Sequence, residues 1–166
     1  MNEGRSQVKS LDHRLAAWWA VPLRFVVGYG FISHGLAKLL KGAAGFAGIL
    51  HALSVPMPSL MAWVTIGVEI GGGLAILVGA FVALVSVPLA AVMLVAMFTV
   101  HLPYGFNSIK LVAVTAAGPQ FGPPGYEVSL LYLASLAALV VGGAGPFSID
   151  ALLQSRRALQ RRPLVG

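Results

Sequence analysis

The chain has 166 residues, of which 58% are hydrophobic and only 10% are charged, and its formal net charge is +6. Soluble domains usually carry about 25% charged residues, so this composition excludes an ordinary soluble domain and indicates an integral membrane protein with one domain. The sequence has no cysteine. Disulfide exchange, thiolate catalysis and cysteine-ligated iron–sulfur clusters are therefore excluded within this chain.

The N-terminal part of the chain predicts a basic tail, a first membrane span and a short helix. Residues 1–16 are polar and basic, and we expect them to form a tail outside the bilayer. The first span is predicted at 17–40, and it begins with Trp18 and Trp19, residues typical of the membrane interface. Residues 46–53 are apolar but too few to span, so they predict a short interfacial helix between the first two spans.

Three further spans are predicted at residues 60–80, 83–102 and 126–145. The second span contains Glu69 near its middle, and Gly67 and Gly71 have the GxxxG spacing that permits close helix packing. A glycine- and proline-rich loop is expected at 103–125, between the last two spans. These elements predict an all-α membrane protein in which residues 17–150 form a four-helix transmembrane bundle.

Basic residues predict the orientation of the chain. The N-terminal tail has three of them and the arginine-rich tail 151–166 has four, whereas the predicted outer connections contain Lys38, Lys41 and Lys110. The positive-inside rule therefore predicts a multi-pass protein with both termini in the cytoplasm. We expect the arginine-rich tail to contact anionic lipid headgroups and not nucleic acid.

This topology brings ionisable residues from three spans to the outer half of the bundle: His34, Lys38, His101 and Glu127. Glu69 lies deeper, where an unpaired charge costs at least about 2.5–3.5 kcal/mol. We therefore expect Glu69 to be protonated or to pair with a cation, and the candidates are Arg24, Lys38 and a histidine.

We expect these side chains to line an outward-opening pocket for a quinone headgroup or a small polar substrate. Histidine and carboxyl groups can donate and accept the protons of such a reaction, and the candidate catalytic residues are His34, Glu69, His101 and Glu127. The candidate substrate-binding residues are Arg24, Lys38, Tyr104, Asn107 and Tyr126. Met97 and the glycines of the second span are expected to form the apolar floor.

Four ordered motifs run through most of the chain: LRFVVGYGFISHGLAKL from Leu23, VEIGGG around Glu69, MFTVHLPYGF from Met97 and GYE at Gly125–Glu127. On these motifs, residues 23–150 resemble the DoxX family of small bacterial membrane proteins. The resemblance implies a four-helix protein of the inner membrane with a redox role. Family members include the small subunit of a thiosulfate:quinone oxidoreductase and a membrane component of a mycobacterial oxidoreductase complex.

The expected function is a membrane subunit of an oxidoreductase complex that passes electrons or protons to quinone. The chain has no evident redox centre of its own, so we expect a partner subunit or a homo-oligomer. Two other functions fit the sequence: a non-catalytic membrane anchor or assembly factor for a redox or metal-handling complex, and a small proton-coupled transporter.

The polar residues also allow other interpretations. They could form a buried network that fixes the helix register. A haem between His34 and His101 is less favoured, because both lie near the surface and there is no second histidine pair. Met93, Met97 and His101 share a helical stripe that would suit Cu(I), although methionine at this spacing more often fills a core.

Overall fold

The structure is a computed structural model that describes residues 17–160, and these residues are mostly helical, as predicted. The described part begins with a 3₁₀ turn, η1 (Ala17–Trp19). The α-helices are α2 (Ala20–Lys41), α3 (Ala43–Ala52), α4 (Pro58–Val78), α5 (Val82–Ala96), α6 (Glu127–Gly142) and α7 (Ile149–Gln160). Helix α5 continues through a π-helical turn, η2 (Met97–His101), into a 3₁₀ turn, η3 (Leu102–Tyr104).

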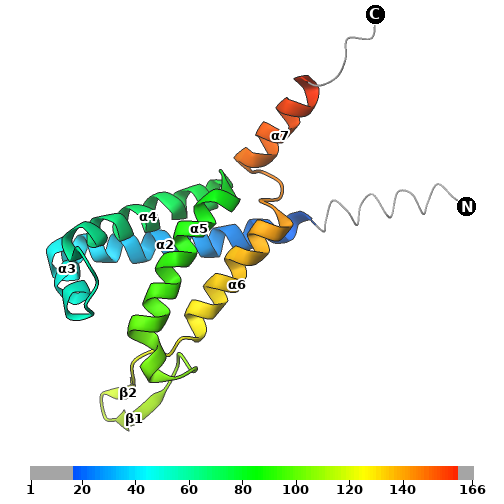
Figure 1. The fold of residues 1–166 in the computed structure, drawn as a ribbon. Coiled ribbons are helices and arrows are strands. Elements are labelled where there is room, and N and C mark those ends of the chain that lie inside the picture. The colour runs from blue at the N-terminus through cyan, green and yellow to red at the C-terminus, as the bar shows by residue number, and fades with distance from the viewer. Residues whose placement is uncertain (1–16, 161–166) are drawn as a thin grey trace, which may run out of the picture.

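The segment between η3 and α6 corrects the expectation of an all-α chain with a loop at 103–125. It contains an antiparallel hairpin of β1 (Leu111–Thr115) and β2 (Gly118–Phe121). The first strand includes β-branched Val112 and Val114, which favour extended backbone, and Gly118 supplies the positive φ of 114° at the turn. The hairpin extends beyond the ends of α5 and α6 (Figure 1).

Two helices in the described residues are long and apolar enough to cross a membrane, Pro58–Val78 and Val82–Tyr104. On the second, Leu84 and Val87 are 72% and 68% exposed, which suits contact with lipid better than contact with water. Helix α6 has only 16 residues, and α2 carries three basic residues. The structure therefore supports a membrane protein, while the four-span arrangement stays a prediction.

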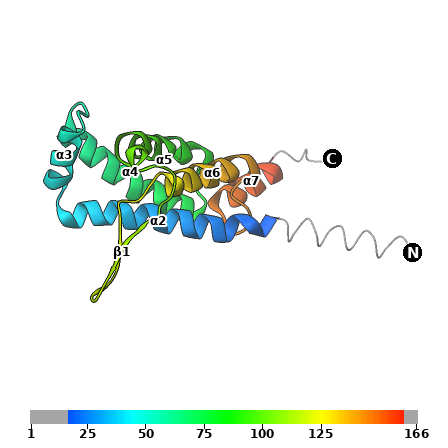
Figure 2. The ribbon, with the colours of Figure 1, turned by 90° about the horizontal axis from the view of Figure 1, so that it is seen from below.

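The helices form two antiparallel pairs, α2 with α4 and α5 with α6, which meet at one end and diverge at the other (Figure 1). We call the end where α4 turns into α5 the joined end, and the opposite end the splayed end. Figure 2 shows that α3 connects α2 to α4 at the splayed end, away from α6 and α7. We call the two helix pairs the arms. The α2–α4 arm is thus capped by α3 and the α5–α6 arm by the hairpin.

Glycines set the close approach of α2 and α4, although not the pair that the sequence predicted. A methyl group on Gly28 would lie 2.7 Å from the Gly73 carbonyl oxygen and 2.9 Å from the Leu77 nitrogen. Gly67 and Gly71 have no such neighbour within 4 Å, so the expected GxxxG contact is wrong for the described residues. The contact face of α4 runs through Gly73 instead, because α2 crosses it there.

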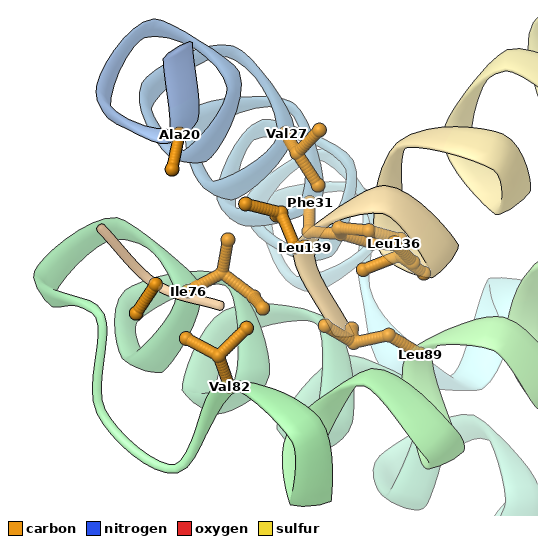
Figure 3. Packing of buried hydrophobic residues seen from close by; sticks show 9 residues of the cluster. Ala20, Val27, Phe31, Ile76, Val82, Leu89, Leu136 and Leu139 are labelled. Atoms are coloured by element: carbon orange, nitrogen blue, oxygen red, sulfur yellow. The ribbon is translucent and has the colours of Figure 1, made fainter. Parts of the chain in front are cut away.

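The main hydrophobic core lies near the joined end, where all four long helices contribute side chains (Figure 3). Its largest fully buried members are Phe31, Ile76, Val82, Leu89, Leu136 and Leu139. A separate small cluster of Ala47, Leu50 and Ala62 holds α3 against α4. Since the core occupies the joined end, it leaves the space between the arms to other side chains.

The chain from α6 to α7 closes the joined end. Helix α6 ends at Gly142, short of the expected span end at 145, because Gly143 adopts a positive φ of 82°. The Asp150 carboxylate then accepts hydrogen bonds from the Phe81 and Val82 nitrogens, at 2.7 and 3.0 Å. These are free N–H groups at the start of α5, so Asp150 caps that helix from a distant part of the chain.

Candidate functional site

An ion pair joins α2 and α4 between the main core and the splayed end. The Lys38 Nζ lies 2.6 and 2.5 Å from the two Glu69 carboxylate oxygens. The side chain of Glu69 is 4% exposed and that of Lys38 is 25% exposed. Gly35 lets the helices approach here, since its face of α2 lies against Glu69 and Ile70. The expected pairing of Glu69 with a cation of the first span is confirmed, and the cation is Lys38.

The same ion pair lines a cavity of about 470 Å³ between the two arms. This volume falls within the range of roughly 300–1,000 Å³ that is usual for small-molecule sites. The polar side chains on its wall are His34, Lys38, Thr65, Glu69, Thr99 and His101. The rest of the wall is apolar and comes from α2, α3, α4, α5 and η2. The cavity therefore combines a small polar group with a large apolar surface.

Phe46 of α3 adds a second contact to the cation. The Lys38 Nζ lies 5.3 Å from the centroid of the Phe46 ring, which also lines the cavity. An ammonium over an aromatic face is attracted by the quadrupole of the ring. Lys38 is therefore held by a carboxylate on one helix and an aromatic ring on another.

The predicted stripe of Met93, Met97 and His101 lies only partly on the cavity wall. Met93 and His101 line the cavity, whereas Met97 is buried and lies outside its wall. Met97 and the glycines of α4 therefore do not form the cavity floor that we expected from the sequence.

His101 joins the cavity to the connection before α6. Its Nδ1 lies 3.1 Å from the Pro124 carbonyl oxygen. A carbonyl oxygen can only accept a hydrogen bond, so Nδ1 must carry the proton in this contact. In the neutral ring, Nε2 is then unprotonated and can accept a proton or a hydrogen bond.

His34 lies on the same face of α2 as Lys38, one turn earlier, and it also lines the cavity. Its ring centroid is 6.4 Å from that of Tyr132 on α6, with an edge-on angle of 73°. Gly30 of α2 has no side chain and so leaves room for the Tyr132 hydroxyl. His34 thus lies between the cavity and the neighbouring arm.

Four expected site residues lie outside the cavity, near the start of α6. The Glu127 carboxylate accepts a hydrogen bond from the Ser108 nitrogen at 3.0 Å. The Asn107 carbonyl accepts one from the Gly125 nitrogen, also at 3.0 Å. Tyr126 packs edge-on against Phe106, with 5.6 Å between the ring centroids, and Tyr104 is exposed. In the structure these contacts hold the hairpin connection against α6.

Arg24 also lies apart from the cavity, near the joined end of α2. Its side chain is 3% exposed and donates hydrogen bonds to the carbonyls of Ala144 at 2.6 Å and Phe147 at 3.1 Å, with a longer one to Pro146. The planar guanidinium suits several acceptors at once. Arg24 therefore binds the turn between α6 and α7, and the structure does not bring it to Glu69.

Two polar wall residues were missed in the sequence analysis. Thr65 precedes Glu69 by four residues and so shares its helix face, which is a signal that the sequence contains. Thr99 lies in the π turn, and its hydroxyl donates to the Val95 carbonyl at 2.7 Å. Thr99 follows Val92 and Ala96 of the wall at seven and three residues, so the helical period also contains the signal for it.

Comparisons with known proteins agree with the sequence motifs. The family model described as DoxX matches residues 19–102. An uncharacterized protein of Haemophilus influenzae is 33% identical over 130 residues, which cover 77% of this chain and 85% of that protein. No solved structure matches the chain. The chain therefore belongs to the DoxX family.

Proposed function

We propose that this protein is a membrane subunit of an oxidoreductase complex and that it binds a quinone headgroup in the cavity between its arms. One observation carries the proposal: the Lys38–Glu69 ion pair and two histidines share a cavity whose other walls are mostly apolar. Such a combination suits an apolar ring with polar atoms at opposite sides. Membership of the DoxX family also fits a membrane protein linked to an oxidoreductase.

The polar groups of the cavity can do the proton chemistry that this ligand needs. Quinone gains protons on its oxygens when it is reduced, and quinol loses them when it is oxidised. Lys38 can donate hydrogen bonds to a carbonyl oxygen and stabilise negative charge on it. Neutral His101, with Nδ1–H held by Pro124, can accept a proton through Nε2. His34 can serve as a second donor or acceptor.

The electrons would come from another component. The chain contains no cysteine, so it cannot hold a cysteine-ligated cluster. We therefore propose a partner subunit that carries the redox centre and docks on the membrane domain. In the predicted orientation, this electron-donating partner would bind on the outer side of the membrane.

Quinone-dependent activity of the complex tests this function. The complex is purified in mild detergent, its extract is analysed for quinone, and reduction of a quinone analogue is followed by absorbance. We expect His34→Ala and His101→Asn each to lower activity at least tenfold. A general acid–base group contributes about 10²–10⁴-fold to a rate, and the remaining polar groups can replace part of that contribution. Asparagine retains a donor near Nδ1 for Pro124, so His101→Asn tests Nε2 itself.

Tyr104→Phe is the matched control, because Tyr104 is exposed and lies outside the cavity wall. It should leave activity unchanged. Full activity in folded His34 and His101 variants would contradict the quinone site.

A second candidate is a non-catalytic anchor or assembly factor, favoured by the engagement of Glu127 in the fold. Its carboxylate and the Ser108 hydroxyl fix the connection before α6, so part of the predicted polar cluster has a structural role. In this case the histidine variants would lose co-purifying partner protein before they lost quinone. Mass spectrometry of the purified variants separates the two candidates.

A further inference from the structure

Part of the cavity wall consists of residues of the long apolar helices that are exposed. Val64 on α4 is 45% exposed and Val95 on α5 is 50% exposed, yet both line the cavity. Val100 in η2 is 38% exposed and lines it as well. Since α4 and α5 with its extension are the two candidate membrane spans, these exposed residues would lie at the level of the bilayer, where lipid can reach them.

The hairpin connection does not form the entrance. Within the described residues, the wall ends at His101, and no residue of 102–142 belongs to it. The polar groups expected at an aqueous mouth, Tyr104, Asn107 and Tyr126, are all outside it. Another side is covered by α3, whose Phe46 and Leu50 contribute apolar wall together with Leu53 just after the helix. Much of the remaining wall comes from α4 and α5, where Val64 and Val95 are exposed.

The ion pair and the exposed valines lie on different parts of the cavity wall. Lys38 and the nearly buried Glu69 lie at the α2–α4 contact, while Val64 and Val95 lie on the exposed faces of α4 and α5. A ligand that spans this path needs a hydrogen-bonding head at one end and an apolar body at the other. A small water-soluble molecule would leave the valine walls uncovered.

We propose that the cavity is filled sideways from the bilayer, by a ligand whose apolar tail lies between α4 and α5 while its polar head contacts the Lys38–Glu69 pair. This inference rests on the proposed quinone function and specifies its ligand as a tailed, membrane-soluble quinone. Burial of the tail removes apolar surface from water, so affinity measured from water rises with tail length, but so does the partition of the ligand into detergent. The decisive comparison is therefore between variants in the same detergent.

The experiment uses the full chain in one detergent with two probes, decylubiquinone and the headgroup-only ubiquinone-0. Val95→Trp fills the proposed entrance, because it places a large ring on the exposed wall. Val87→Trp is the matched control on the same helix, since Val87 is 68% exposed and lies outside the cavity. We expect Val95→Trp to weaken decylubiquinone binding about tenfold and Val87→Trp to leave it unchanged.

The head is tested separately with the double variant Lys38→Met/Glu69→Gln, which should weaken binding of both probes. A photoreactive group at the end of the quinone tail gives an independent readout, and we expect it to label peptides of α4 and α5. Thermal unfolding of each variant shows whether it is folded. If Val95→Trp does not fold, the labelled peptides decide the result.

The outcomes distinguish this inference from the function on which it rests. Equal binding of decylubiquinone by Val95→Trp and the unchanged chain, or labelling confined to residues 102–126, would overturn sideways entry and leave a quinone site intact. Failure of both probes to bind the unchanged chain would overturn the quinone function. A phospholipid that co-purifies with the unchanged chain but not with Val95→Trp would support entry from the bilayer and overturn quinone as the ligand.

Discussion

At the scale of single residues, two cations of α2 have different tasks. Lys38 neutralises Glu69 where a carboxylate would otherwise be unpaired at 4% exposure. Arg24 satisfies main-chain carbonyls of the turn after α6, where the backbone has left the helix and its acceptors need partners. Lys38 therefore pairs with an opposite charge, whereas Arg24 donates hydrogen bonds to backbone carbonyls. Only the first borders the cavity.

Removal of the Glu69 charge should destabilise the protein. In Glu69→Gln, Lys38 keeps a hydrogen-bond acceptor but loses its counter-charge, so we expect the free energy of unfolding to fall by about 2–4 kcal/mol. Reversible unfolding in mixed micelles measures the change. Adding Lys38→Met should recover most of the loss, because no unpaired charge remains. Equal stability of the single and double variants, both well below the unchanged chain, would argue against the ion pair as the cause.

At the scale of elements, the register of α2 against α4 depends on small residues. Gly28 and Gly73 bring the backbones together, and Gly35 repeats the close approach further along α2, beside Glu69. This register puts Lys38 at the level of Glu69. The turn from α4 to α5 joins the two helix pairs. Asp150 near the start of α7 accepts hydrogen bonds from this turn, so α7 begins at a defined place on the bundle.

Gly28→Ala should destabilise the α2–α4 pair. The added methyl group would meet backbone atoms of Gly73 and Leu77, which cannot move aside like a flexible side chain. We expect a loss of about 1–3 kcal/mol in the free energy of unfolding, the usual effect of overpacking. Gly67→Ala on α4 is the control, since nothing lies within 4 Å of the added group, and it should be neutral or stabilising by up to about 1 kcal/mol. A similar effect of both substitutions would place the close contact elsewhere.

Asp150→Ala should loosen the joined end. Loss of the cap leaves the Phe81 and Val82 nitrogens without their acceptor and should cost about 1–2 kcal/mol. Hydrogen exchange of these two amides should become faster, and protease cleavage near residue 148 should increase. Gln154→Ala, in the exposed part of α7, is the control and should change neither measurement. Unchanged exchange at Phe81 and Val82 in Asp150→Ala would contradict the cap.

At the scale of the whole molecule, two helix pairs share a core at one end and leave a cavity between them at the other. The core therefore stabilises the fold without filling the site. The apolar outer faces of α4 and α5 suit contact with lipid.

The predicted orientation can be tested because the chain has no cysteine of its own. A single cysteine is introduced by Val112→Cys, in the exposed hairpin, or by Ser155→Cys, in exposed α7. The positive-inside rule predicts that a membrane-impermeant maleimide labels the first variant in spheroplasts and labels the second only after the membrane is opened. Labelling of Ser155→Cys in intact spheroplasts would reverse the orientation and the proposed outward donor side.

The sequence by itself determined the class of protein, the positions of the main helices and the need of Glu69 for a partner. These follow from apolar segments of sufficient length and from the cost of an unpaired charge in lipid, which are local properties of the chain. Its motifs also identified the DoxX family, which the comparisons confirmed.

Only the tertiary structure decided which polar residues meet. The register of α2 on α4, set by Gly28 and Gly73, selects Lys38 over Arg24 as the partner of Glu69. The divergence of the arms keeps Glu127 out of the cavity, and Met97 is buried outside its wall. These outcomes depend on contacts between distant segments, which a hydrophobic pattern does not contain.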